Sequence, residues 1–143
     1  MRWWWAGRGA LLSCGMRDWR VHDFGRLTVY QRAVELAATV VAACAASELR
    51  RQPVRRAQLE RAAESIHANI AEGSASGSDA NFARFLQHAI GSAAELQSHL
   101  SFAKRLRLLP PDAHDSLAAE TIAVRRMLIG LQRYVRRDMP PGG

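Results

Sequence analysis

The chain has few cysteines, few aromatic residues and no long apolar run, and each shortage excludes a class of protein. Its 143 residues include two cysteines, Cys14 and Cys44, whose spacing fits neither a zinc site nor a disulfide framework. Aromatic residues make up 7% of the chain, which is little for a strand-rich sandwich. No segment approaches the roughly 20 apolar residues of a membrane-spanning helix. A helical domain in a reducing, cytoplasmic location is the simplest interpretation.

Lysine is also scarce: Lys104 is the only one, and arginine supplies nearly all of a formal net charge of +7. The codon bias of a GC-rich genome accounts for arginine in place of lysine, but not for the excess of cations over anions. Guanidinium groups pair with phosphate through two parallel hydrogen bonds. The charge balance therefore indicates either a surface that meets polyanions or, more simply, a solvated basic face.

What the chain does contain is helical periodicity, in four segments that place apolar residues three and four positions apart. We expect helices over 28–48, 54–73 and 79–108, followed by a fourth that Asp112 or Asp115 caps. Short turns between four such helices predict an all-α fold, an antiparallel up-down-up-down four-helix bundle. The stripes expected to be buried in the first and fourth helices are Leu27, Tyr30, Val34, Ala37, Val41 and Cys44, and Leu117, Thr121, Val124, Leu128, Leu131 and Val135.

The boundaries of the middle two helices follow from the residues that break helices. Pro53 ends the first connection, and Gly73 is expected to take the left-handed conformation that terminates the second helix. Ser78 is expected to cap the third helix after the small residues 74–78. The stripes expected to be buried in these two helices are Leu59, Ala62, Ala63, Ile66 and Ile70, and Phe82, Leu86, Ala89, Ala93, Leu96, Leu100 and Ala103.

The ends of the chain lack this periodicity. We expect the bundle to cover residues 24–138 and residues 139–143 to be a disordered tail. Residues 1–23 are expected to be an extension, either disordered or the product of a start assigned too early, with Met16 the true initiator. The stretch before Cys14 faintly resembles a lipoprotein cleavage site, but Arg8 and two glycines interrupt it, so we do not expect a signal peptide.

The predicted topology clusters the positive charge. The first and third connections of an up-down bundle lie at the same end, so we expect nucleic-acid-binding cations there: Arg50, Arg51, Arg55, Arg56, Lys104, Arg105 and Arg107. A second basic group follows the fourth helix: Arg125, Arg126, Arg133, Arg136 and Arg137. No pattern in the chain predicts sequence-specific recognition.

A polar line runs beside the apolar stripes of the second and third helices. Its residues are read either as a network that fixes the register of the two helices or as a ligand or partner site, and the first interpretation is favoured. We expect Gly91 to allow the helices to approach closely. The network consists of Ser65, Asn69, Glu72, Gly73, Gly91, Ser92 and Glu95.

Candidate catalytic and metal-binding patterns are incomplete. Bundle di-metal sites need two Glu-x-x-His elements, but only Glu64-Ser-Ile-His67 is present, and the first and fourth helices offer just Glu35, Glu48 and Glu120. There is no nucleophile turn and no phosphate-binding loop. We therefore expect no catalytic residue, no metal, no cofactor and no small-molecule substrate. A metal-dependent bundle enzyme is kept as a remote alternative.

The polar line and its neighbours also carry a family resemblance. The matching residues are Ala62, Ala63, Ser65, Ile66, Asn69, Ile70, Ala71, Glu72 and Gly73, then Phe82, Phe85, Leu86, Ala89, Gly91, Ser92, Glu95 and Leu96. With the opening Phe24-Gly-Arg-Leu-Thr-Val-Tyr-Gln31, the chain resembles, over residues 16–137, the four-helix-bundle proteins of 23S rRNA intervening sequences. Residues 74–78 depart from the family, in which basic or aromatic residues are common at this loop.

The resemblance implies a non-enzymatic bundle that self-assembles into a ring, notably a homopentamer. A related accessory protein of diversity-generating retroelements is a basic pentameric barrel that works with a reverse transcriptase and nucleic acid. By this resemblance the expected partners are copies of the chain, together with RNA or a reverse transcriptase complex. The alternative is a structural or partner-scaffolding bundle that binds no nucleic acid.

Overall fold

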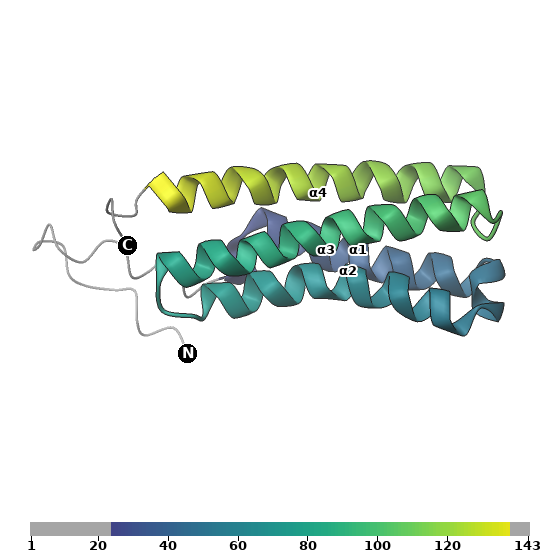
Figure 1. Cartoon of the computed structure of the whole chain (residues 1–143), viewed down its shortest axis with the longest axis horizontal. Coiled ribbons are helices and arrows are strands. Elements are labelled where there is room, and N and C mark those ends of the chain that lie inside the picture. The colour runs from purple at the N-terminus through teal and green to yellow at the C-terminus, as the bar shows by residue number, and fades with distance from the viewer. Residues whose placement is uncertain (1–23, 138–143) are drawn as a thin grey trace, which may run out of the picture.

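A computed structural model describes residues 24–137, and these residues form four long helices that alternate in direction (Figure 1). The described part contains no strand, so the predicted all-α up-down-up-down bundle is confirmed. The expected extension at 1–23, the start at Met16 and the tail at 139–143 lie outside the described residues. The elements are η1 (Phe24–Arg26), α1 (Thr28–Ala45), η2 (Glu48–Arg51), α2 (Pro53–Ser74), α3 (Asp79–Arg105) and α4 (Pro111–Arg137).

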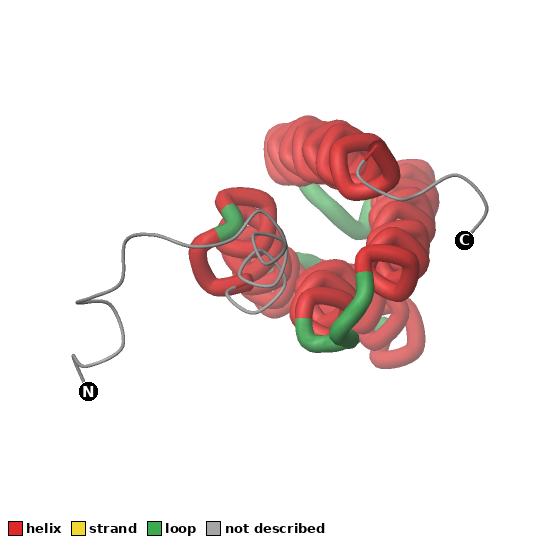
Figure 2. The backbone as a smooth tube through the Cα atoms, turned by 90° about the vertical axis from the view of Figure 1, so that its left-hand side faces the viewer, coloured by secondary structure: helices red, strands yellow, loops and turns green. Residues whose placement is uncertain are grey.

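The helices lie at the corners of a square, each packed against its neighbours along the chain (Figure 2). The α2–α3 and α3–α4 contacts are the most extensive, and the α1–α4 contact that closes the bundle is the smallest of the four. A bidentate ion pair bridges that last side: Arg32 donates from Nε and Nη2 to the two carboxylate oxygens of Glu120, at 2.8 and 2.6 Å. This hydrogen bond and the charge of Glu120 raise the pKa of Arg32.

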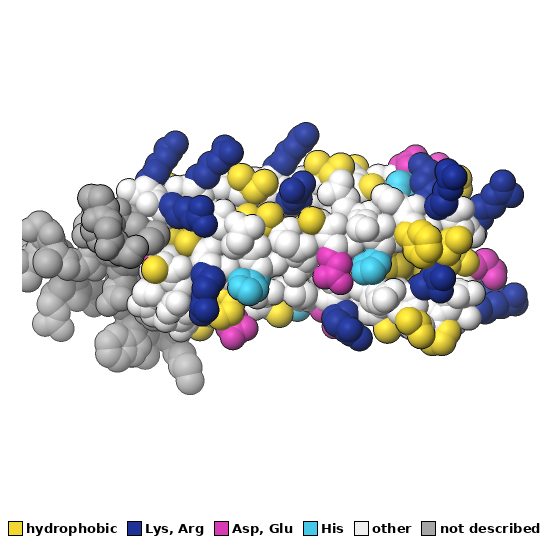
Figure 3. All heavy atoms as spheres, in the orientation of Figure 1, with side chains coloured by type: hydrophobic (Ala, Val, Ile, Leu, Met, Phe, Trp, Pro, Cys, Tyr) yellow, Lys and Arg dark blue, Asp and Glu magenta, His cyan; other side chains and the backbone are white. Residues whose placement is uncertain are grey.

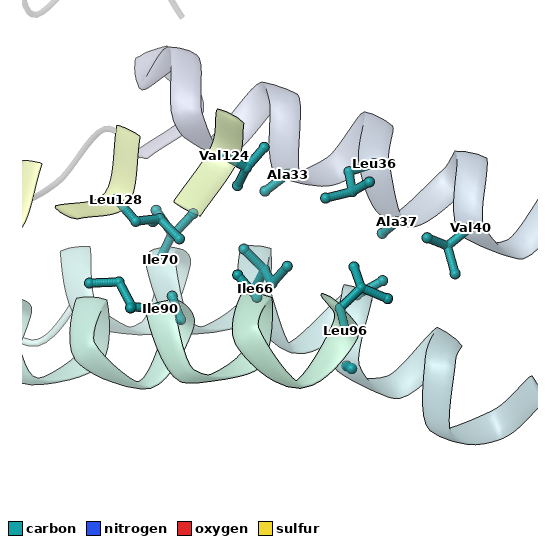
Figure 4. Packing of buried hydrophobic residues seen from close by; sticks show 14 of the residues in the cluster. Ala33, Leu36, Ala37, Val40, Ile66, Ile70, Ile90, Leu96, Val124 and Leu128 are labelled. Carbon is teal, nitrogen blue, oxygen red and sulfur yellow. The ribbon is translucent and has the colours of Figure 1, made fainter. Parts of the chain in front are cut away.

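The core is built from leucine, isoleucine, valine and many alanines, which let the helices pack closely. Side chains from all four helices converge on its centre, among them Leu36, Ile66, Leu96 and Val124 (Figure 4). Every residue of the stripes predicted for the second and third helices is buried. Helical periodicity was therefore sufficient to identify the inward faces of α2 and α3.

The stripe predicted for the first helix is partly wrong. Val34 and Val41 are each 36% exposed, and Leu27 and Tyr30 are only half-buried. Apolar residues occur on several sides of α1, so their spacing is compatible with more than one buried face. Packing against both α2 and α4 selects a face rotated from the predicted one, consisting of Val29, Ala33, Leu36, Ala37, Val40 and Cys44.

One position of the predicted fourth-helix stripe also differs. Leu131 is half-buried, and the neighbouring Gln132 is buried instead. The Gln132 amide Nε2 donates to the carbonyl oxygen of Ala83 and to Oε1 of Gln87, both at 3.0 Å. These bonds to α3 satisfy the two N–H donors of the amide and offset part of the cost of removing it from water. The apolar period alone does not distinguish a buried glutamine from a leucine beside it.

The prediction that Gly73 ends its helix in a left-handed conformation is wrong. The α2 helix continues to Ser74, and the glycine with positive φ in the following turn is Gly77, at 78°. Gly73 is instead a point of close approach between helices. A Cβ atom built there would lie 2.6 Å from Cβ of Phe85 and 2.9 Å from Cδ2 of Phe82, closer than packed atoms approach.

The cap predicted at Ser78 is confirmed, since its hydroxyl accepts from the backbone N–H of Asn81 at 3.2 Å.

This close approach predicts opposite effects for two glycine-to-alanine substitutions. Gly73→Ala should lower the free energy of unfolding by about 1–3 kcal/mol, because α2 and α3 must separate to admit the methyl group. Gly130→Ala, in α4, should raise it by about 1 kcal/mol, because a Cβ there meets nothing within 4 Å and helix propensity improves. Urea unfolding of both variants measures the difference. A Gly73→Ala protein as stable as Gly130→Ala would show that the helices are free to separate.

Candidate nucleic-acid interface

The up-down topology brings the η2 connection and the α3–α4 connection to the same end of the bundle (Figure 1). All seven cations predicted for this end lie there, together with Glu48, Glu60, Asp112 and Asp115. Basic side chains gather at this end in the space-filling view (Figure 3). We call this surface the basic pole, and it consists of Arg50, Arg51, Arg55, Arg56, Lys104, Arg105 and Arg107.

Local sequence fixes the η2 side of the basic pole. The Ser47 hydroxyl accepts from the backbone N–H of Leu49 at 3.4 Å and caps η2. Leu49 is fully buried and anchors this single turn to the core. Pro53 then occupies the first position of α2, where its missing N–H costs nothing. With Leu49 directed inward, the side chains of Arg50 and Arg51 are largely exposed to solvent.

The α3–α4 side of the basic pole contains a backbone conformation that is unusual for arginine. Arg107 has φ 58°, the left-handed region in which glycine is favoured. The turn closes the end of α3 with two 2.9 Å bonds: Leu108 N–H donates to the Ala103 carbonyl, and Arg107 N–H donates to the Lys104 carbonyl. A non-glycine residue in this conformation costs about 1–2 kcal/mol. The chain thus carries a cation at a position where glycine would make the folded protein more stable.

Acidic neighbours neutralise part of the basic pole. Glu48 lies 3.8 Å from Arg50 and 3.6 Å from Arg51, measured between nitrogen and oxygen atoms. Arg56 donates to Glu60 at 2.7 Å, which raises the pKa of the arginine. The remaining cations, Arg55, Arg105 and Arg107, have no carboxylate partner within residues 24–137. Seven cations against four acids leave the pole with an excess of three positive charges.

Asp115 has the most constrained carboxylate of the pole. It accepts from Nδ1 of His114 at 2.8 Å and from Nζ of Lys104 at 3.3 Å. These two hydrogen bonds, the first being the larger cause, lower the pKa of Asp115. The carboxylate therefore remains charged through the neutral range and offsets the charge of Lys104.

Away from the pole, burial raises the pKa of the Cys44 thiol to about 11, so this thiol stays protonated and unreactive near neutrality.

Arg55 makes a different contact from the other cations of the pole. Its guanidinium carbon lies 5.5 Å from the centre of the Phe102 ring, and its Nε is buried without a hydrogen-bond partner. Phe102 is not among the residues predicted for the basic pole. The available signal was its position between Leu100 and Ala103, both in the buried stripe, which places Phe102 off that face.

The second basic group lies along α4 and is visible along the upper edge of Figure 3. Its nearest described acid in sequence, Glu120, is bound by Arg32 of α1, a pairing across 88 positions that no local pattern could reveal. Arg125 is half-buried and its Nε has no hydrogen-bond partner. The other members are exposed: Arg126, Arg133, Arg136 and Arg137.

The polar line forms a smaller hydrogen-bonded chain than predicted. Nδ2 of Asn69 donates to the carbonyl oxygen of Ser65 at 2.8 Å and to its Oγ at 3.0 Å. Oγ of Ser65 lies 2.8 Å from Oγ of Ser92, which donates in turn to the carbonyl of His88 at 3.1 Å. Either hydroxyl can be the donor in the Ser65–Ser92 bond. The hydrogen-bonded chain joins α2 to α3.

Four members of the predicted network lie outside this chain, and one of them is Gly73, which acts through close packing. Glu72 is exposed and has no hydrogen bond or ion pair with the described residues. Glu95 is exposed and contacts His99 at 3.4 Å. Gly91 is exposed, and a Cβ there would meet nothing within 4 Å, so the expectation that it allows close approach within the bundle is wrong. The helices make their close contact at Gly73 instead.

Within 24–137, no three histidine, cysteine, aspartate or glutamate side chains come together in a way that could hold a metal ion. His67 of the Glu-x-x-His element packs with its ring edge-on to Tyr30, at 6.2 Å between centroids. None of the described helices combines the length and the apolarity needed to cross a bilayer.

Comparisons with known proteins agree with the architecture. The family described as 23S rRNA-intervening sequence protein matches the chain over residues 25–130. A crystal structure of a protein of unknown function from the S23 ribosomal protein family of Bacteroides thetaiotaomicron has a similar fold, with a TM-score of 0.68. The two chains are 24% identical, and the match covers 73% of this chain and 95% of the other. No curated protein matches.

The hydroxyl pair between α2 and α3 predicts a measurable coupling. A double-mutant cycle of Ser65→Ala and Ser92→Ala should give a coupling free energy of about 0.5–1.5 kcal/mol, the net worth of one hydrogen bond. The cycle cancels the change in helix propensity that each alanine introduces. The control cycle pairs Ser65→Ala with Ser101→Ala, whose hydroxyl bonds the carbonyl of Gln97 instead. Equal coupling in the two cycles would show that the Ser65–Ser92 contact contributes nothing.

Proposed function

The chain belongs to the family of 23S rRNA-intervening sequence proteins, and from that premise we propose that it is a non-enzymatic, self-assembling bundle that binds RNA through the basic pole. The family description states no activity, so the proposal rests on the surface. The observation that carries it is the convergence at one end of the bundle of Arg55, Arg105 and Arg107, which have no carboxylate partner among residues 24–137.

The physical argument is release of counterions. RNA holds a dense layer of cations, and each arginine that replaces one returns a salt ion to solution. Arginines already paired with glutamate gain less, because the phosphate must compete with the carboxylate. The unpaired cations are therefore the favoured phosphate contacts. Nothing at the pole presents an ordered set of donors and acceptors to base edges, so the proposed binding is non-specific in sequence.

The conformation of Arg107 supports this use of the pole. Glycine at this position would relieve the left-handed backbone, yet the chain carries a cation there. A residue that lowers stability where a simpler one would serve is expected at a functional surface. In the proposal Arg107 gives up about 1 kcal/mol of stability for one additional phosphate contact.

Self-assembly is the second part of the proposal, and it rests on the family resemblance and on the outer α2–α3 face. Gly91 is exposed there with open space around it, beside the hydroxyl chain of Ser65 and Ser92. Small residues of this kind allow a second copy to approach closely. A ring, with five copies the expected number, would repeat the basic pole as a collar and add avidity to weak single contacts. Its proposed partners are RNA and, through RNA, a reverse transcriptase complex.

A scaffold without nucleic-acid binding is the competing proposal. The observation that favours it is the exposure of Val54, Phe102 and Leu106 at the pole, which suits a protein partner as well as a ligand with aromatic rings. The scaffold predicts assembly without salt-dependent RNA binding.

If RNA binds at the basic pole, the location of an arginine should affect RNA binding more than the net charge of the protein does. The double variant Arg105→Gln/Arg107→Gly should lower the slope of log affinity against log salt by about 1.4, since each single-strand phosphate contact contributes about 0.7. Its control, Arg126→Gln/Arg133→Gln, removes two charges from α4 and should change the slope little. Fluorescence anisotropy with two unrelated RNAs measures both. A larger decrease of the salt slope in the control variant would place the RNA-binding site on α4. If the wild type binds no RNA at low salt, the scaffold proposal is favoured.

Arg107→Gly alone should separate stability from binding. The variant should gain about 1 kcal/mol in free energy of unfolding, because glycine accepts the left-handed φ without strain. It should nevertheless bind RNA more weakly than the wild type. Urea unfolding and anisotropy on the same preparation give both quantities. A variant that is more stable and binds equally well would remove Arg107 from the interface.

The assembly proposal is tested by the outer face of α3. Native mass spectrometry of the full chain should show a closed homo-oligomer, with a pentamer expected. Gly91→Leu should convert it to smaller species while circular dichroism remains helical, because the new side chain occupies the proposed subunit contact. Gly130→Leu is the matched control on α4, where a Cβ also meets nothing within 4 Å. A wild-type monomer would contradict the proposal.

A further inference from the structure

The basic pole also carries an exposed apolar cluster. Val54 is 69% exposed, Phe102 52% and Leu106 42%, and they are three of the six large hydrophobic residues exposed in the described part of the chain. Figure 3 shows this apolar patch over α2 and α3, directly beside the basic side chains. Charge and apolar surface thus coincide at one end of the bundle.

Phe102 is the aromatic member of this group, and Arg55 contacts its ring. Arg55 covers one side of its ring, with the guanidinium carbon 5.5 Å from the ring centre. A hollow beside the ring is lined by Arg55, Gln58, Leu59, His99, Phe102 and Ala103. The hollow is too small to admit a planar base, so a ligand can contact the ring from outside but cannot enter a pocket.

The position of the nearby cations suits a strand that passes over this ring. Arg105 lies at the last position of α3, less than one turn beyond Phe102, and Arg107 follows in the connection. Both lack a carboxylate partner among the described residues, so both can meet phosphate. An aromatic face flanked by free arginines is the arrangement with which proteins hold single-stranded nucleic acid.

We propose that Phe102, supported by Arg55, is a stacking platform for an unpaired RNA base, whose flanking phosphates are bound by Arg105 and Arg107. This inference rests on the proposed function and makes it more specific: the ligand is single-stranded RNA. Bases within a duplex already stack on each other and cannot cover the ring. Every base has a π face, so the platform is tolerant of sequence.

The surface favours a base over an acidic peptide as the occupant. An amphipathic helix docks its apolar side chains into a continuous groove. Here the hollow beside Phe102 is small, and the exposed apolar residues are Val54 in α2, Phe102 in α3 and Leu106 directly after α3. A single base stacked on the Phe102 ring, with a phosphate on each side of it, matches the shape and the charge of this surface.

The test compares the full-length wild type with Phe102→Leu, which keeps an apolar side chain but removes the aromatic face. Anisotropy is measured near physiological salt with three probes: a 15-nucleotide single-stranded RNA, a duplex with the same number of phosphates, and an abasic strand. Phe102→Leu should weaken binding to the intact single strand roughly tenfold. It should leave the salt slope unchanged, because no phosphate contact is lost. Phe102→Trp should restore the affinity.

Tyr134→Leu is the matched control, because it removes an exposed aromatic ring from α4 at a distance from the pole. This variant should bind like the wild type. Melting curves for all variants establish that the bundle remains folded, which is expected for a residue as exposed as Phe102.

The outcomes separate the platform from the proposed function. If Phe102→Leu binds like the wild type, or if the abasic strand binds as tightly as the intact one, the platform is overturned while salt-dependent RNA binding stands. If the wild type binds no RNA at all, the platform and the proposed function fail together. An acidic helical peptide that binds the wild type and loses affinity with Phe102→Leu, while RNA binding is unaffected, would assign this surface to a protein partner.

Discussion

The close approach of α2 and α3 is the contact on which the rest of the bundle depends. Gly73 lets the backbone of α2 lie against the Phe82 and Phe85 side chains, and the Ser65–Ser92 hydrogen bond fixes the register farther along the same pair. The other two helices pack against this pair, and their own contact is the smallest of the four. Arg32 and Glu120 close that side with an ion pair that is partly exposed and therefore contributes modestly.

The same packing positions the proposed interface. Because α2 and α3 are antiparallel, the start of α2 lies beside the end of α3, and the connections that precede α2 and follow α3 share one pole. Arg55 and Phe102 contact each other across this pair, although 47 positions separate them. The α2–α3 pair therefore carries Arg55, the exposed ring and Arg105, and the α3–α4 connection adds Arg107 at its edge.

Periodicity predicted the fold and the inward faces of α2 and α3, since every residue of their predicted stripes is buried. It did not select the face of α1, whose apolar residues permit more than one, nor the buried Gln132, which depends on partners in α3. The basic pole followed from topology alone. Which of its cations are unpaired did not, because that depends on individual side-chain contacts. Gly73 was identified as important but assigned the wrong role, since a glycine at a helix end and a glycine at a helix crossing look alike in sequence.

The central claim is that RNA contacts the pole formed by η2, the start of α2 and the α3–α4 connection. Hydrogen–deuterium exchange with mass spectrometry, with and without a single-stranded RNA, tests it most directly. The account predicts slower exchange on RNA binding in peptides that cover residues 48–52 and 106–110, where backbone amides lie outside long helices. Exchange in the α2–α3 turn at 75–78, at the opposite end, should not change. Protection confined to 75–78, or no protection in either connection of the pole, would contradict the account.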